Sequence, residues 1–161
     1  MKFDKIITVL TNQFGEDSIL SKDTTSTPES IRIEPSKLLE VMGFLQADER
    51  LYFDSLSCLT AVDNGVESDS MELIYNLYSI PYDHHLMVKV MLDRASPSVD
   101  SLVPLWKTAD WHEREAYDLM GINFNGHPDL RRILMPADWD GHPLRKDYEE
   151  QTYYRGVKVN Y

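Results

Sequence analysis

The chain has 161 residues, of which 42% are hydrophobic, so it is long enough for one folded domain with a single core. Its formal net charge of −11 disfavours binding to nucleic acid or to anionic lipid headgroups, because both are negatively charged. A single cysteine, Cys58, excludes an internal disulfide and a four-thiolate iron–sulfur cluster made by this chain alone. The sequence has no apolar run of about 18 residues, and its N-terminal apolar run is too short for a signal peptide. We therefore expect a soluble, cytoplasmic protein.

The first 47 residues predict two helices separated by two short strands. Residues 3–14 place apolar side chains at helical spacing and end near Gly15, which predicts an amphipathic helix. Residues 19–20 and 31–33 are predicted as strands on either side of a polar loop. Pro35 suits the first turn of the second helix. The apolar face of that helix would consist of Leu38, Val41, Met42 and Leu45.

Three longer strands are predicted next, with a turn at residues 63–65 after the first of them. One face of the first strand, residues 51–62, would hold Leu56, Cys58, Thr60 and Val62. Cys58 is therefore expected to be a small buried side chain. The buried faces of the other two strands would hold Met71, Leu73, Tyr75 and Leu77, and Leu86, Val88, Val90 and Leu92. His84 and His85 are expected at a hairpin tip.

The order of helix, two strands, helix and three strands predicts an α+β fold. We expect a single mixed or antiparallel sheet with helices packed on one side, followed by a long extended C-terminal segment. Residues 98–106 should form a short helix interrupted by Pro104. Asp110 and Glu113 suggest a capping box at the start of another helix, which Gly121 would end. In that helix Ala116, Leu119 and Met120 would face the core, and Arg114 would pair with Asp118 on the surface.

Beyond Ile122 no helix or strand of normal length fits, because prolines and glycines recur. Disorder is disfavoured by the aromatic and aliphatic side chains of this stretch. A long segment that neither buries itself nor is disordered needs another surface to hold it. We therefore divide the chain into a globular α+β domain, residues 1–121, and an extended C-terminal segment, residues 122–161, that docks on a partner protein.

Three kinds of chemistry compete for the residues after Trp111. A metal site could use His112, Glu113, His127, Asp129, His142 and Asp147. Successive histidines of this set are 15 residues apart, however, so no pair has the short spacing of a preformed metal site. His127 and His142 lie in Gly-His-Pro tripeptides, residues 126–128 and 141–143, which fit turns whose imidazoles cap backbone groups. Glu113, Glu115 or Asp118 could act in acid–base catalysis. The simpler interpretation is that these acids stabilise the start of a helix, where the helix dipole favours negative charge. Arg131, Arg132, Arg145 and Lys146 alternate with apolar residues, which favours a protein interface. The sequence contains no nucleotide-binding motif and no Cys-x-x-Cys pair.

Two blocks of this C-terminal part resemble a known family. The first runs from Glu113-Arg114-Glu115 through Asp118-Leu119-Met120 to His127, Arg131 and Ile133-Leu134. The second is Gly141-His142-Pro143-Leu144-Arg145-Lys146-Asp147-Tyr148. Together they resemble the C subunit, or 30 kDa subunit family, of NADH–quinone oxidoreductase, which is respiratory complex I.

The resemblance implies a cofactor-free structural subunit in the peripheral arm of a proton-translocating enzyme. Such a subunit has no catalytic site of its own, and it braces the large quinone-site subunit, which is similar to the large subunit of nickel–iron hydrogenases. The assembled complex would carry FMN, iron–sulfur clusters and quinone, and would place this chain at the cytoplasmic face of the bacterial inner membrane. Two alternatives remain: a scaffold subunit in a ferredoxin-driven or hydrogenase-type membrane complex, and a small metal-dependent enzyme using His112, His127 and His142.

The resemblance also implies which residues form the family motif and the partner interface. Acidic and basic residues of the first block would fix the helix, Arg131, Arg132, Arg145 and Lys146 would make charged contacts, and the apolar residues would anchor the interface. The full set is Glu113, Arg114, Glu115, Asp118, Gly121, His127, Leu130, Arg131, Arg132, Ile133, Trp139, Gly141, Pro143, Leu144, Arg145, Lys146, Asp147 and Tyr148.

Overall fold

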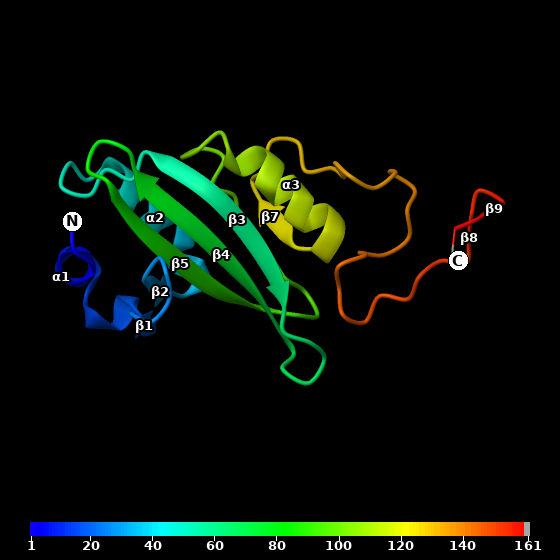
Figure 1. Ribbon diagram of the computed structural model, residues 1–161, viewed down its shortest axis with the longest axis horizontal. Coiled ribbons are helices and arrows are strands. Elements are labelled where there is room, and N and C mark those ends of the chain that lie inside the picture. Colours follow the sequence, from blue (N-terminus) through cyan, green and yellow to red (C-terminus); the bar gives the residue numbers. More distant parts are fainter. Residues whose placement is uncertain (160–161) are drawn as a thin grey trace.

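A computed structural model describes residues 1–159 and has a five-stranded sheet at its centre (Figure 1). The strands of this sheet are β1 (Ser21–Asp23), β2 (Ser30–Arg32), β3 (Ser55–Asp63), β4 (Ser70–Ser79) and β5 (His84–Asp93). The helices are α1 (Phe3–Phe14), α2 (Leu38–Ala47) and α3 (Ala109–Met120), with 3₁₀ turns at η1 (Glu16–Ser18) and η2 (Pro35–Lys37). Four shorter strands complete the described chain: β6 (Ser98–Asp100), β7 (Asn123–Asn125), β8 (Tyr153–Tyr154) and β9 (Val157–Lys158).

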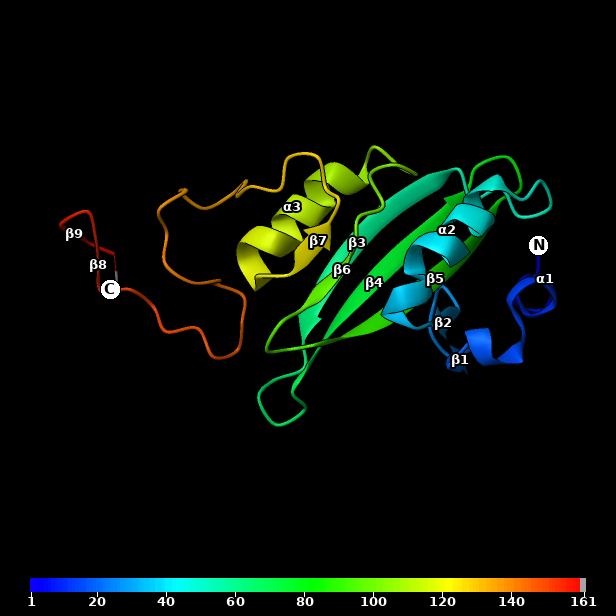
Figure 2. The ribbon, with the colours of Figure 1, turned by 180° about the vertical axis from the view of Figure 1, so that it is seen from behind.

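The main sheet has the strand order β1-β2-β5-β4-β3 and is mixed, because β2 and β5 are parallel while the other neighbours are antiparallel. Its buried face carries the side chains that alternation predicts on β4 and β5, all 5% exposed or less. Helix α2 lies across one face of the sheet (Figure 2) and buries Leu38, Val41, Met42 and Leu45. The predicted α+β class and the predicted faces of α1 and α2 are confirmed.

Strand β3 differs from the simple alternation that the sequence suggests. Its register shifts between Leu56 and Cys58, so Leu56 and Leu59 are its buried apolar side chains. Cys58 is half-buried, and its Sγ lies 3.4 Å from the hydroxyl of the exposed Thr60. The prediction of Cys58 as a buried core residue was therefore wrong.

Three further local predictions were wrong for physical reasons. Residues 19–20 precede the first strand, because β1 begins at Ser21, where pairing with β2 starts. His84 and His85 do not form a loop tip, since they begin β5 and pair with Ser79 and Tyr78. The segment 98–106 is not a helix, because its first three residues form β6, which pairs in parallel with β7.

The C-terminal part of the chain is exposed or half-buried after Phe124. Ile122 and Phe124 still belong to the core, but no residue in the range 126–159 is buried. Figure 1 shows this stretch as a long winding connection that ends in the β8–β9 hairpin. The division into residues 1–121 and 122–161 stays a prediction, and residues 160 and 161 lie outside the described part. Within residues 1–159, no helix is long and apolar enough to cross a membrane.

Candidate functional site

The carboxylate of Asp118 joins α3 to the first part of the C-terminal segment. Its side chain is 0% exposed. Oδ2 accepts the consecutive backbone N–H groups of Ile133, Leu134 and Met135 at 3.0, 2.7 and 2.8 Å. Oδ1 accepts a hydrogen bond from Arg132 Nη1 at 2.7 Å. One buried carboxylate therefore fixes four successive residues that have no secondary structure of their own.

Burial raises the pKa of Asp118, but the hydrogen bonds from Met135, Arg132, Leu134 and Ile133 outweigh burial, and the net result is a lowered pKa. The predicted surface pair of Arg114 with Asp118 was wrong, because Asp118 points into this buried arrangement. Arg114 instead donates to the backbone carbonyls of Arg131 and Arg132 at 3.2 and 3.3 Å.

Arg132 connects the two sequence blocks within the chain. Its Nη2 donates to the carbonyl oxygens of Trp139 at 3.0 Å and Gly141 at 2.8 Å, while Nη1 remains on Asp118. The guanidinium fork can serve these partners simultaneously because its donors diverge in one plane. Arg132 thus holds residues 139 and 141 close to the C-terminal part of α3.

The second block begins against the C-terminal end of α3. His142 Nδ1 lies 2.9 Å from the carbonyl oxygen of Asp118, and the backbone N–H of Leu144 donates to Leu119 O at 3.0 Å. Both groups supply partners for helix carbonyls that have none inside the helix. Gly121 ends α3 in the left-handed conformation, with φ +75°, as predicted from its position.

Gly121→Ala is expected to lower the free energy of unfolding by about 1–3 kcal/mol. A residue with a Cβ costs about 1–2 kcal/mol in this conformation, and the new Cβ would lie 2.7 Å from His142 Cδ2. Chemical denaturation measures the loss. Gly126→Ala is the matched control, because Gly126 has φ +76° but no atom within 4 Å of the added Cβ. Equal losses in both variants would show that the contact with His142 contributes nothing.

A second carboxylate, Asp63 at the end of β3, holds the end of the second block. Its Oδ1 accepts the Gly65 N–H and Arg94 Nε, each at 2.8 Å, and its Oδ2 accepts Arg94 Nη2 at 3.0 Å and the Lys146 N–H at 2.8 Å. Arg94 Nη2 also lies 2.6 Å from Asp147 Oδ1. Hydrogen bonding to Arg94 holds the pKa of Asp63 well below its usual range, despite burial.

Asp63 and Arg94 are site residues that the sequence reasoning missed. They are 31 residues apart from each other, and Asp63 is 83 residues from Lys146. Asp63 was recognised only as part of a turn. The available signal was a charged residue at the end of β3 and another directly after β5.

The predicted cationic residues differ in how much of them is free for a partner. Arg145 donates through Nη2 to the carbonyl oxygen of Arg94 at 3.0 Å. The Arg131 side chain is 70% exposed and pairs with the neighbouring Asp129. Arg132 is only 15% exposed and is occupied within the chain. Their contacts with a partner stay a prediction.

The predicted apolar anchors, Trp139, Tyr148, Leu130 and Ile133, are all half-buried. Trp139 Nε1 donates to the hydroxyl of Tyr148 at 3.0 Å, and the Trp139 ring packs on Tyr154 with centroids 5.1 Å apart. Leu130 packs against the core. Pro143 is half-buried as well. The ring of Tyr148 lies close to Gly141, since a Cβ added at this glycine would be 3.0 Å from it. The large apolar side chains that are exposed from α3 onward include Trp111 (68%), Leu134 (61%), Leu144 (61%), Tyr153 (62%) and Val157 (64%).

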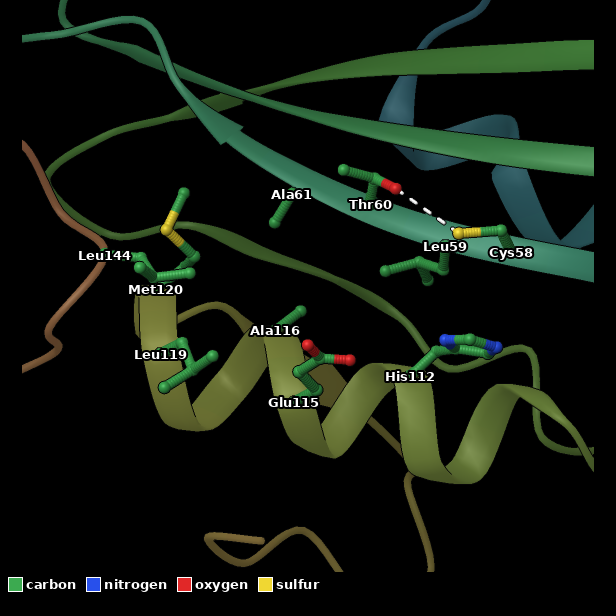
Figure 3. Close-up of a pocket in the computed structure, with 10 residues that line it drawn as sticks. All are labelled: Cys58, Leu59, Thr60, Ala61, His112, Glu115, Ala116, Leu119, Met120 and Leu144. Carbon is green, nitrogen blue, oxygen red and sulfur yellow. Dashed lines mark hydrogen bonds between the residues drawn. The ribbon is translucent and has the colours of Figure 1, made fainter. Parts of the chain in front are cut away.

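A small cavity of about 230 Å³ lies between β3 and α3 (Figure 3). Its walls include Cys58, Ala116, Leu119 and Leu144, with His112 and Glu115 toward one end. The volume is below the roughly 300 Å³ at which small-molecule sites begin. Of the three acids considered for catalysis, only Glu115 lines this cavity.

The three histidines of the metal hypothesis lie in separate settings. His112 lines the cavity, His127 contacts Asp110, and His142 caps the end of α3. Among residues 1–159, no three His, Cys, Asp or Glu side chains are grouped so that they could hold a metal ion. The imidazoles of His127 and His142 contact backbone groups, which confirms the capping role predicted for the Gly-His-Pro turns.

Glu113 does not form the predicted capping box with Asp110. Helix α3 begins after Thr108 without a side-chain cap, and Glu113 is 0% exposed. Its Oε2 accepts from Ser101 Oγ at 2.6 Å, and its Oε1 accepts from the Leu102 N–H at 2.7 Å. Glu113 therefore joins α3 to the segment after β6.

A known protein family matches most of the chain, including both sequence blocks that form this site. The family described as "Respiratory-chain NADH dehydrogenase, 30 Kd subunit" matches residues 31–154, a range that includes both carboxylate centres and the loops they hold. The chain belongs to this family. The resemblance of the two blocks to the 30 kDa subunit family of NADH–quinone oxidoreductase is thereby confirmed.

Curated relatives give the same family. The NADH-quinone oxidoreductase C subunit of Chloroherpeton thalassium is 43% identical over 95% of this chain, which spans 63% of that relative's length. Its counterpart from Chlorobium phaeobacteroides is 40% identical over 95% of this chain and 92% of its own length. The counterpart from Moorella thermoacetica is 49% identical over 74% of this chain and 79% of its own.

Two solved structures share the fold. A trypsin-resistant fragment of Nqo5 has a TM-score of 0.67 and 23% identity, covering 81% of this chain and all of the fragment. A chain of a membrane-bound sulfane sulfur reductase, an archaeal respiratory membrane complex, has a TM-score of 0.77 and 19% identity, covering 92% of this chain and 86% of its own. At these identities the likeness shows the fold alone.

Proposed function

We propose that this chain is a cofactor-free structural subunit in the peripheral arm of a proton-translocating NADH:quinone oxidoreductase. It braces the large quinone-site subunit, the one similar to hydrogenase large subunits, and it has no catalytic site of its own. It reaches the cytoplasmic face of the bacterial inner membrane only through the complex, whose other subunits carry FMN, iron–sulfur clusters and quinone.

The observation that carries this proposal is an ordered segment without a core. In the range 126–159 no residue is buried as a whole, although the His127 side chain is, and Asp118, Arg132 and Asp63 hold backbone groups of this range at defined positions. Ordering a chain costs roughly 1–2 kcal/mol per residue in backbone entropy. Such an arrangement is useful to the protein when the ordered segment presents side chains to another surface.

The exposed side chains of this segment suit a protein partner. Leu134 and Leu144 supply apolar area, while Arg131, near them in sequence, supplies a guanidinium that is 70% exposed although it is paired with Asp129. Apolar anchors with an arginine at the rim are typical of specific interfaces. The names of the curated relatives favour NADH–quinone oxidoreductase over a ferredoxin-driven or hydrogenase-type complex with the same scaffold role.

Leu134→Asp is expected to reduce co-purification of this chain with the large subunit at least about tenfold, while leaving the fold intact. Leu134 is 61% exposed, so its side chain stabilises the free chain little, but a charge at an apolar anchor opposes docking. Its backbone N–H to Asp118 is unaffected. Pull-down of the tagged chain from detergent-solubilised membranes, with NADH-to-quinone activity of the recovered complex, gives the result.

Ile80→Asp is the matched control, because Ile80 is 62% exposed but lies between β4 and β5, outside the C-terminal segment. Its recovery of the complex should equal that of the unchanged chain. Equal recovery with Leu134→Asp would remove Leu134 from the interface. Recovery of the unchanged chain as a lone monomer would contradict the scaffold function itself.

A further inference from the structure

Glu113 is a buried acid that the scaffold function does not use. Its two hydrogen bonds, to Ser101 Oγ at 2.6 Å and to the Leu102 N–H at 2.7 Å, both enter from the segment after β6. Because the side chain is 0% exposed, no surface contact with a partner explains its presence. An isolated buried carboxylate is costly, so this position demands a physical reason.

Titratable groups from three elements surround this carboxylate. Asp110 comes from α3 itself, and its negative charge acts on Glu113. Tyr75 comes from β4, and its buried hydroxyl has no hydrogen-bond partner among the described residues. Burial raises the pKa of Tyr75, and the nearby Glu113 charge raises it further. His127 comes from the turn after β7, and its ring is 0% exposed.

His127 occupies the position between the two acids. Its Nε2 lies 4.0 Å from Glu113 Oε2, 3.3 Å from Asp110 Oδ1 and 3.2 Å from Asp110 O. Its Nδ1 lies 3.0 Å from the backbone nitrogen of Asp129, whose N–H it accepts. Since Nδ1 is an acceptor, the neutral ring carries its hydrogen on Nε2, which faces the acids.

This arrangement decides where an additional proton binds. The Asp129 N–H already occupies the lone pair of His127 Nδ1, and the turn depends on that hydrogen bond. A proton on Glu113 leaves that bond in place. It also keeps both hydrogen bonds of Glu113, because Oε1 still accepts from the Leu102 N–H while a protonated Oε2 donates to Ser101 Oγ, which then becomes the acceptor. Burial raises the pKa of Glu113 to about 7, although the bonds from Ser101 and Leu102 oppose the rise.

We propose that Glu113 is a reversible proton-binding site whose occupancy controls how firmly the turn at residues 126–129, and with it the start of the C-terminal segment, is held. Ionised Glu113 attracts the Nε2–H of His127 alongside Asp110. Protonated Glu113 lacks that attraction, so Asp110 is then the one acid that holds the Nε2–H of His127, while Nδ1 still accepts from the Asp129 N–H. This inference concerns the free chain and stands whether or not the segment docks on a partner.

Nitrogen-15 NMR of the full chain between pH 5.5 and 8.5 can follow two backbone amides, one that senses proton binding at Glu113 and one that senses the turn at residues 126–129. The Leu102 N–H touches the carboxylate, and the Asp129 N–H touches His127. We expect both signals to shift with one midpoint near pH 7. Above it, exchange of the Asp129 amide, corrected for its intrinsic pH dependence, should slow about three- to fivefold.

Glu113→Gln keeps the size of the side chain and cannot ionise. We expect both transitions to disappear and the Asp129 amide to exchange at its fast, low-pH limit throughout. Glu115→Gln on the exposed side of α3 is the control and should retain both transitions. Should Glu113→Gln fail to fold, Ser101→Ala serves instead: loss of one donor to the carboxylate should move the shared midpoint to higher pH.

The opposite outcomes overturn the proposal. A Leu102 transition that survives in Glu113→Gln assigns the proton to another group. A Leu102 transition without any change at Asp129 shows that the proton does not control the turn. An unchanged midpoint in Ser101→Ala likewise assigns the proton to a group other than Glu113.

Discussion

Asp118→Asn is expected to lower the free energy of unfolding by about 3–5 kcal/mol, the range for removing one member of a buried ion pair. The amide has one oxygen where the carboxylate has two, so its NH2 group would face either Arg132 or the three backbone N–H groups of residues 133–135. Chemical denaturation of the full chain measures the loss. Glu115→Gln on the same helix, an exposed carboxylate, should change stability little.

The same carboxylate gives the chain a definite acid sensitivity. The folded-state pKa of Asp118 lies below the ordinary value of 3.8, so its contribution is fully present above that value. It is lost as the pH falls through the lowered folded pKa. Asp118→Asn should therefore flatten the decline of stability in this acidic range, and an unchanged decline would contradict the assignment.

Asp63→Asn is expected to cost about 3 kcal/mol and to release the second block from the sheet. The substitution replaces one oxygen of a carboxylate that accepts hydrogen bonds from Gly65, Arg94 and Lys146. Arg94 is left with Asp147, whose side chain is 46% exposed, as its carboxylate partner among the described residues. Limited proteolysis near residues 145–148, together with denaturation, separates local release from global loss.

Glu67→Gln is the control for Asp63, because it removes a charge from the same turn at an exposed position. It should leave both proteolysis and stability unchanged. If Asp63→Asn lowered stability without accelerating cleavage near residue 146, Asp63 would stabilise the β3 turn but not the attachment of the second block.

Local patterns in the sequence predict much of the fold. Side chains at helical spacing identify α1 and α2, alternation identifies the buried faces of β4 and β5, and Gly121 marks the end of α3. These features depend on residues close together in the chain. The bulge in β3 and the pairing of β6 with β7 depend on distant backbone partners, and no local spacing reveals them.

The same distinction applies to the site. The blocks around residues 113–134 and 141–148 stand out in the sequence, yet the partners of their charged residues do not. The Arg132 guanidinium meets a carboxylate 14 residues away, so the sequence alone presents it as a free charge available to a partner. The backbone N–H of Lys146 meets a carboxylate 83 residues away, which no local pattern reveals either. Side chains that remain exposed after folding, such as Arg131 and Leu134, are the better candidates for docking.

Amide hydrogen exchange, compared between the free chain and the purified membrane complex, measures most directly whether the C-terminal segment docks on a partner. We predict that the protection gained on assembly concentrates in residues 126–159, with little change in α1 and β1. Equal exchange of residues 126–159 in the two states would contradict docking by this segment.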